Sequence, residues 1–197
     1  MNQQRFYISL EFFKSIHPVS NELKHFIKQK TKFEQYKKGE IINQSGQLCD
    51  KLMIITKGMV RGFFTHSSKE ITTWISFDME MFTSISGFFK NEPGIETIQA
   101  LEDTIIEYME YEDIHKCLTA FKESAIINRV LMEEYYISAE NRAFMARIPL
   151  AKDRYVFYLK NTKQDFVSRI PKKYLASLLN MQPETLTRIT SAIKSQE

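Results

Sequence analysis

Cysteine is scarce in this sequence: its 197 residues include only Cys49 and Cys117. Two thiols are too few for the disulfide framework of a small secreted domain, and too few for a four-cysteine iron–sulfur cluster. We therefore predict no cofactor, and we expect both cysteines to be buried thiols in a reducing, cytoplasmic environment.

Long uncharged hydrophobic runs are also absent. No stretch approaches the roughly 20 apolar residues of a membrane-spanning helix, and residues 1–13 lack the apolar core of a signal peptide. The composition, 43% hydrophobic and 26% charged, is typical of a folded soluble protein. We expect no membrane partner.

The most informative stretch that is present runs from Ile170 to Ile189 and predicts two short helices joined by a tight turn. Pro171 and Pro183 suit the first turn of a helix, where a missing N–H costs nothing. Asn180 lies at the turn and tolerates a left-handed conformation. Apolar residues at helical spacing form the inner face of the pair: Leu175, Ala176, Leu178, Leu179, Leu186, Ile189 and Ile193.

The opposite face of the second helix carries Glu184, Thr185 and Arg188. This arrangement is typical of a helix-turn-helix, whose second helix enters the major groove of double-stranded DNA. Arginine suits guanine O6 and N7, and glutamate can accept from cytosine N4. We expect Lys172 and Lys173, at the start of the first helix, to contact phosphates. The alternative is an ordinary helical hairpin with a charged outer face.

Charge is distributed unevenly along the chain. Residues 149–197 contain nine Lys or Arg against four Asp or Glu, whereas the rest carries a slight negative charge. A basic C-terminal module is typical of a nucleic-acid-binding domain. Pro149 ends the preceding helical pattern, so we predict two domains, residues 1–148 and 149–197. In the second, a helix over Asp153–Leu159 and a polar link over Lys160–Ser168 precede the helix-turn-helix.

The first domain combines helices with closely spaced strands. Residues 6–30 predict two helices divided by Pro18. Short β-rich runs with turns at Gly39, Gly46 and Gly58 then predict a β jelly roll. These runs are Glu40–Asn43, Lys51–Thr56, Met59–Thr65, Glu70–Phe77, Glu96–Leu101 and Thr104–Tyr108. A short helix over Tyr111–Leu118 follows, so the predicted fold class is α+β.

A long helix is predicted from about Glu123 to Ile148. Its residues follow the alternating three–four spacing of a coiled-coil seam, with polar residues at two positions that could fix register. The seam consists of Ile127, Val130, Glu134, Ile137, Asn141, Phe144 and Ile148. This pattern favours a homodimer. Periodicity alone equally allows a core helix that packs on its own β domain.

In this order, the jelly roll, long helix and terminal helix-turn-helix resemble the Crp–Fnr family of bacterial transcription regulators. The resemblance rests on four segments: Lys38-Gly39-Glu40, Lys57-Gly58 with Val60-Arg61, Ala100-Leu101-Glu102, and Pro183-Glu184-Thr185-Leu186-Thr187-Arg188. It implies a dimeric DNA-binding regulator with RNA polymerase and a small-molecule effector as further partners. It also implies base contacts by Glu184 and Arg188 and a phosphate contact by Thr185.

The sequence departs from that family in three places. Pro183 replaces an arginine that precedes the glutamate, and the β-wing that often follows the recognition helix is not expected. The phosphate cassette of the cyclic-AMP-binding members, Gly-Glu and then Arg-Ser, aligns with Thr83, Ser84, Gly94 and Ile95. No arginine lies between Arg61 and Arg129, so a cyclic phosphate would lack its charge partner.

We therefore predict no useful affinity for cyclic AMP or cyclic GMP. Phe82, Thr83 and Ser84 remain candidates for lining an effector pocket. The jelly-roll cavity could hold an apolar or uncharged molecule, or the protein could act constitutively. The nearby aromatics suit either a ligand or a dry core, and we favour the core: Trp74, Phe77, Phe82, Phe88 and Phe89.

We predict that the protein is not an enzyme. The alternative is a cupin-like jelly-roll protein, binding a small molecule or acting as an enzyme, with a helical appendage. Cupin metal sites use closely spaced histidines, whereas the four here, His17, His25, His66 and His115, are far apart. A regulator retained only as a protein-interaction module is a further alternative, against which the Glu184 and Arg188 face argues.

Overall fold

The structure, a computed structural model, describes residues 6–195. This part of the chain divides into two compact units. The first contains the chain up to Gly62 and Ile75–Glu134, and the second contains Phe63–Trp74 and the chain from Tyr135 onward. The predicted boundary after residue 148 stays a prediction.

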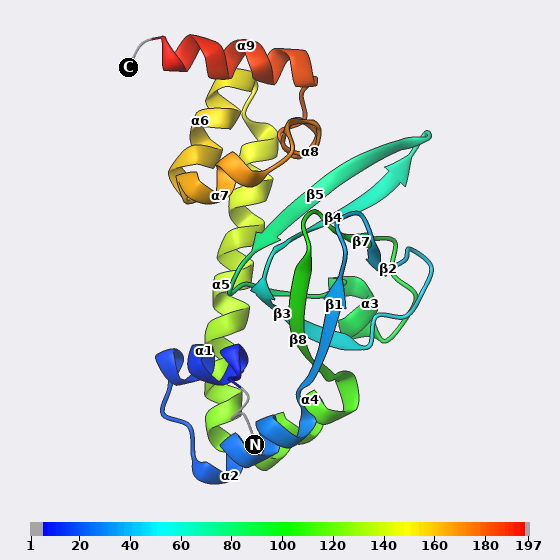
Figure 1. The fold of residues 1–197 in the computed structure, drawn as a ribbon, viewed down its shortest axis with the longest axis vertical. Helices are drawn as coiled ribbons and strands as arrows, with labels where there is room; N and C mark the ends of the chain where they lie inside the picture. Colours follow the sequence, from blue (N-terminus) through cyan, green and yellow to red (C-terminus); the bar gives the residue numbers. More distant parts are fainter. Residues whose placement is uncertain (1–5, 196–197) are drawn as a thin grey trace. The chain divides into compact units, whose positions relative to one another are not determined.

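The strands form two four-stranded sheets (Figure 1), of orders β1-β8-β3-β6 and β2-β7-β4-β5, and all of them lie in the first unit except the adjoining parts of β4 and β5 within Phe63–Trp74. The antiparallel pairs include β1 with β8, where Lys32 lies opposite Tyr108, and β3 with β8, where Met53 lies opposite the same residue. The strands are β1 (Lys32–Tyr36), β2 (Ile41–Asn43), β3 (Lys51–Lys57), β4 (Met59–His66), β5 (Lys69–Phe77), β6 (Met81–Phe82), β7 (Thr97–Ala100) and β8 (Thr104–Glu110).

The six predicted strands are thus confirmed to within about two residues at each end, whereas β1 and β6 were not predicted. The turn glycines Gly39, Gly46 and Gly58 all have positive φ, at 92°, 85° and 124°. At Gly58 both the positive φ and the lack of space exclude a side chain. An added Cβ would lie 2.5 Å from Thr104 Oγ1 and 2.8 Å from Thr104 Cα. This close approach fixes the turn between β3 and β4.

Helices pack at one end of the first unit. They are α1 (Ile8–Ile16), α2 (Asn21–Lys30), α4 (Tyr111–Ala120) and the start of α5 (Lys122–Arg147), while the short α3 (Ile85–Lys90) follows β6. Leu10, Leu23, Ile27, Cys117 and Ile127 form a buried cluster there, and the burial of their apolar surface stabilises the arrangement. The split of residues 6–30 around Pro18 and the long helix are confirmed. The helix α3 was not predicted.

The second unit contains α6 (Ala151–Asn161), α7 (Gln164–Arg169), α8 (Lys172–Leu178) and α9 (Pro183–Lys194). The prediction of a polar link over Lys160–Ser168 is wrong, because α7 overlaps most of it. Val167 on α7 is only 8% exposed, and the burial of its apolar surface stabilises the helix against the rest of this unit. Across residues 6–195, no helix is both long and apolar enough to span a membrane.

Candidate nucleic-acid interface and effector site

The helix pair α8 and α9 has the predicted turn between its helices. Asn180 is in the left-handed conformation, with φ of 49°. Its N–H donates to Ser177 O at 3.0 Å, and the N–H of Met181 donates to Ala176 O at 3.0 Å. These two bonds form a Schellman motif, which satisfies carbonyls at the end of α8 and stops that helix. The turn therefore depends on the local sequence, above all on the left-handed conformation of Asn180.

The inner face of the pair is apolar and tightly packed. Leu175, Ala176, Leu179 and Leu186 are at most 5% exposed. Pro183 occupies the first turn of α9, as predicted, whereas Pro171 is the residue just before α8 rather than its first residue. This packing holds α9 with one face toward the unit and the other toward solvent.

The outer face of α9 carries the predicted base-contacting residues. Glu184 and Arg188 are both exposed, and they lie four residues apart on one side of the helix. Thr185 is half-buried, and Lys172 and Lys173 are exposed at the start of α8. The Nζ of Lys173 lies 4.5 Å from the centre of the Tyr174 ring, a contact that leaves its charge in solvent. An arginine and a carboxylate on an exposed helix face can meet base edges, and exposed lysines can meet phosphates.

Three of the seven residues of the predicted dimer seam are exposed. Ile137 and Phe144 are 56% and 53% exposed, so both leave apolar surface in contact with water. Glu134 is exposed, while Val130, Asn141 and Ile148 are half-buried. Ile127 differs: it is 3% exposed within the cluster of α1, α2 and α4, so it is not available to a partner. The available part of the seam therefore begins at Val130.

The three effector-pocket candidates, Phe82, Thr83 and Ser84, are all buried. Thr83 Oγ1 donates to Lys51 O at 2.8 Å and lies 3.4 Å from Cys49 Sγ, so its hydroxyl is used within the chain. Ser84 Oγ lies against two glycines: a Cβ added to Gly94 would approach it to 2.5 Å, and one added to Gly87 to 3.0 Å. Both side chains therefore lie within the packed interior of the chain.

Arg61 is 1% exposed on β4. Its Nε and Nη2 donate to Gln99 Oε1 at 2.9 and 2.7 Å, and Gln99 Nε2 donates to Gly39 O at 2.9 Å. The guanidinium thus joins β4 to β7 and to the turn at Gly39. These hydrogen bonds stabilise the folded state, because breaking them would leave the buried guanidinium charge without hydrogen-bond acceptors.

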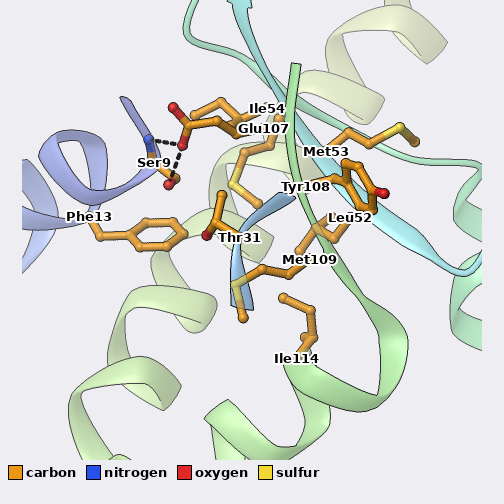
Figure 2. A pocket seen from close by; sticks show the side chains of 11 residues that line it. Ser9, Phe13, Thr31, Leu52, Met53, Ile54, Glu107, Tyr108, Met109 and Ile114 are labelled. Carbon is orange, nitrogen blue, oxygen red and sulfur yellow. Dashed lines mark hydrogen bonds between the residues drawn. The ribbon is translucent and has the colours of Figure 1, made fainter. Parts of the chain in front are cut away.

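A cavity of about 30 Å³ lies elsewhere in the first unit, between α1 and the sheet that contains β8 (Figure 2). Apolar side chains such as Phe13, Met53 and Met109 line much of it. Glu107, 1% exposed, accepts hydrogen bonds from the backbone N–H groups of Ile8 and Ser9 at 2.6 and 3.0 Å and from the Ser9 hydroxyl. It thereby caps the first turn of α1. The volume suits about one water molecule and is far too small for a nucleotide.

Neighbouring strands are tied by a charged cluster around Glu34. Lys51 Nζ donates to both of its carboxylate oxygens at 2.8 and 3.0 Å, and the Tyr36 hydroxyl donates to it as well. Burial would raise the pKa of Glu34, but these hydrogen bonds outweigh it and hold the pKa below its ordinary value. Burial, helped by Glu34, raises the pKa of Tyr108 to about 12. The cluster joins β1, β3 and β8, because Lys51 Nζ also lies 4.4 Å from the centre of the Tyr108 ring.

No arrangement for metal chemistry is found in the described chain. Across residues 6–195, no three His, Cys, Asp or Glu side chains are grouped so that they could hold a metal ion. The sequence did not indicate a role for Arg154 on α6, which donates hydrogen bonds to backbone carbonyls in two separate segments of the second unit. The absence of a β-wing stays a prediction.

Comparisons with known proteins agree with this architecture. Residues 33–121 match the family model of the cyclic nucleotide-binding domain, so this part of the chain has that domain's fold. No protein in the curated set matches the sequence.

Several solved protein structures are similar over most of the chain. FixK2 from Bradyrhizobium japonicum has a TM-score of 0.75 at 15% identity, covering 84% of this chain and 85% of its own. A CooA variant from Carboxydothermus hydrogenoformans has a TM-score of 0.70 at 16% identity, with 91% and 81% covered. The catabolite activator protein of Thermus thermophilus has a TM-score of 0.54 at 19% identity, with 92% and 86% covered. At such identities the similarity establishes the fold, which matches that of Crp–Fnr regulators.

Proposed function

We propose that this chain is a sequence-specific, DNA-binding transcription regulator of the Crp–Fnr type, that it acts as a homodimer in the cytoplasm, and that it does not respond to cyclic AMP. The observation that carries the proposal is the outer face of α9. Glu184 and Arg188 lie exposed on one side of a helix that a Schellman turn and a buried apolar face hold in place. This is the arrangement by which a recognition helix presents side chains to the major groove.

Dimerisation is supported by the exposed seam on α5. Ile137 and Phe144 leave apolar surface in water that a second copy of the helix would cover. Two-fold symmetry would then present two recognition helices to successive major grooves, about 34 Å apart along the DNA. RNA polymerase, as a further partner, follows only from the resemblance to the family.

Insensitivity to cyclic AMP is supported by the state of the cassette region. Thr83 and Ser84 are buried, and Thr83 is already bonded to the chain. A phosphate diester taken from water needs a cation or several aligned donors to offset its lost hydration. The Arg61 guanidinium is bonded to Gln99. No observation favours the cupin-like alternative or its metal chemistry.

The DNA-reading role is tested by titrating duplexes with the wild type and two variants at several salt concentrations. Arg188→Ala should cost about 1–3 kcal/mol on a preferred site and little on random DNA, because it removes a base contact. Lys173→Ala should weaken binding to both DNAs alike and reduce the salt slope by about 1, because it removes a phosphate contact. Lys28→Ala, an exposed cation on α2, serves as the control and should leave both affinities unchanged. Equal losses for Arg188→Ala and Lys173→Ala on the two DNAs would refute these roles.

A further inference from the structure

Arg154 on α6 makes an unusual set of hydrogen bonds. Its guanidinium donates to four backbone carbonyls in two separate segments. Nη1 donates to Ile148 O at 2.7 Å and to Pro149 O at 3.0 Å. Nε donates to Leu179 O at 2.7 Å, and Nη2 donates to Asn180 O at 3.0 Å. A single side chain therefore joins two segments that are about 30 residues apart in the sequence.

Both segments are helix ends. Ile148 and Pro149 directly follow α5, which ends at Arg147, and Leu179 and Asn180 follow α8. Carbonyls at a helix C-terminus lack intrahelical donors and carry partial negative charge. A cation with several N–H groups satisfies both needs at once. The planar guanidinium has donors on different edges, so it can bond in two directions, whereas the single ammonium of a lysine cannot span the same four acceptors.

The second segment is the turn of the helix-turn-helix. Asn180 is its left-handed residue, and α9 with Glu184 and Arg188 begins three residues later, at Pro183. The first segment directly follows α5, the helix that carries the exposed seam. Arg154 therefore links the end of the helix that we propose for the dimer interface to the turn that fixes the recognition helix.

We infer that Arg154 is a positioning residue: it sets the orientation of α9 relative to the end of α5, and thereby the spacing and angle at which a dimer presents its two recognition helices. This inference rests on the proposed function. It assigns Arg154 no contact with DNA. Its effect falls on the preference for two correctly spaced half-sites over one, and not on the reading of bases within a half-site.

The test compares Arg154→Lys with the wild type on three duplexes: a preferred two-half-site sequence, the same sequence with one half-site randomised, and versions with the half-sites moved apart by one or two base pairs. The preferred sequence is obtained first by selection with the wild type. Arg147→Lys is the matched control, since Arg147 Nη1 donates to Ala143 O, at 3.1 Å, within α5 itself. Thermal unfolding and hydrogen exchange of residues 176–182 are measured in parallel, without DNA.

For Arg154→Lys we expect the preference for two half-sites over one to fall at least about 10-fold, with half-site affinity changed less than about threefold. Tolerance of altered spacing should widen, and the amides of Asn180 and Met181 should exchange faster. Arg147→Lys should behave as the wild type. A purely structural role would predict equal losses on all duplexes, and that result, or an unchanged preference, would overturn the inference while leaving the proposed function intact. A wild type that binds no DNA would overturn both.

Discussion

Replacing Phe144 on α5 with serine should dissociate the dimer. Phe144 is 53% exposed in the single chain. A phenylalanine side chain carries roughly 200 Å² of surface, so about 100 Å² would be covered on each protomer. At about 25 cal/mol per Å² this amounts to about 2.5 kcal/mol per protomer, and about twice that for a symmetric pair. Because serine keeps part of this contact, we expect the dissociation constant to rise by about 100- to 1,000-fold.

Sedimentation velocity across nanomolar to micromolar concentrations measures this shift. Tyr136→Ser is the matched control, because Tyr136 is also an aromatic on α5 and is 70% exposed, but lies away from the seam. Its substitution should leave the dissociation constant within about threefold of the wild type. The reasoning is refuted if Phe144→Ser dimerises as the wild type does, or if both variants weaken the dimer equally.

Three further outcomes follow from the first unit. Gly58→Ala should destabilise by at least about 2 kcal/mol in urea unfolding, since it combines a φ of 124° with overlap on Thr104, whereas Gly46→Ala, with nothing within 4 Å, should cost about 1. Burial raises the pKa of the Cys117 thiol to about 11 from an ordinary 9.0. The buried neutral thiol therefore contributes stability that is complete below pH 9 and is lost as the pH rises toward 11. Cys117→Ala should reduce this loss of folding free energy at alkaline pH by about 1–2 kcal/mol. Titration calorimetry with cyclic AMP should give no saturable signal at micromolar ligand, and such a signal would contradict our interpretation of the cassette.

Much of the fold could be predicted because its signals are local. The six predicted strands alternate or are rich in β-branched residues between turn signals, and the long helix lacks any internal breaker. β1 was not predicted because Lys32, Glu34 and Gln35 make it largely polar, and because its position in the sheet depends on pairing with β8. β6 has only two residues. α7 depends on the burial of Val167, which a window of sequence does not reveal.

Some residues of the candidate site could likewise be predicted from local sequence signals, and others could not. The exposure of Glu184 and Arg188 on one side of α9 could be predicted from their spacing alone, because residues four apart in a helix lie on the same face. Thr83 and Ser84 could be selected as polar residues at the right alignment, but whether they face a cavity or a packed core depends on Gly87 and Gly94, which bring the chain close. Arg154 gave no signal, since an arginine in a helix ordinarily marks a surface, and its acceptors are backbone carbonyls distant in sequence.

The most direct measurement of the central proposal is selection of bound duplexes from a randomised library by the wild-type protein, at a fixed salt concentration near physiological. Two exposed recognition helices related by two-fold symmetry predict an enriched motif that is palindromic, with half-site centres about 10–10.5 base pairs apart. Specific binding at that salt should exceed binding to random DNA by at least about 1,000-fold. A library that shows no enrichment, or a single motif without two-fold symmetry, would contradict the proposal that this chain is a dimeric, sequence-specific DNA-binding regulator.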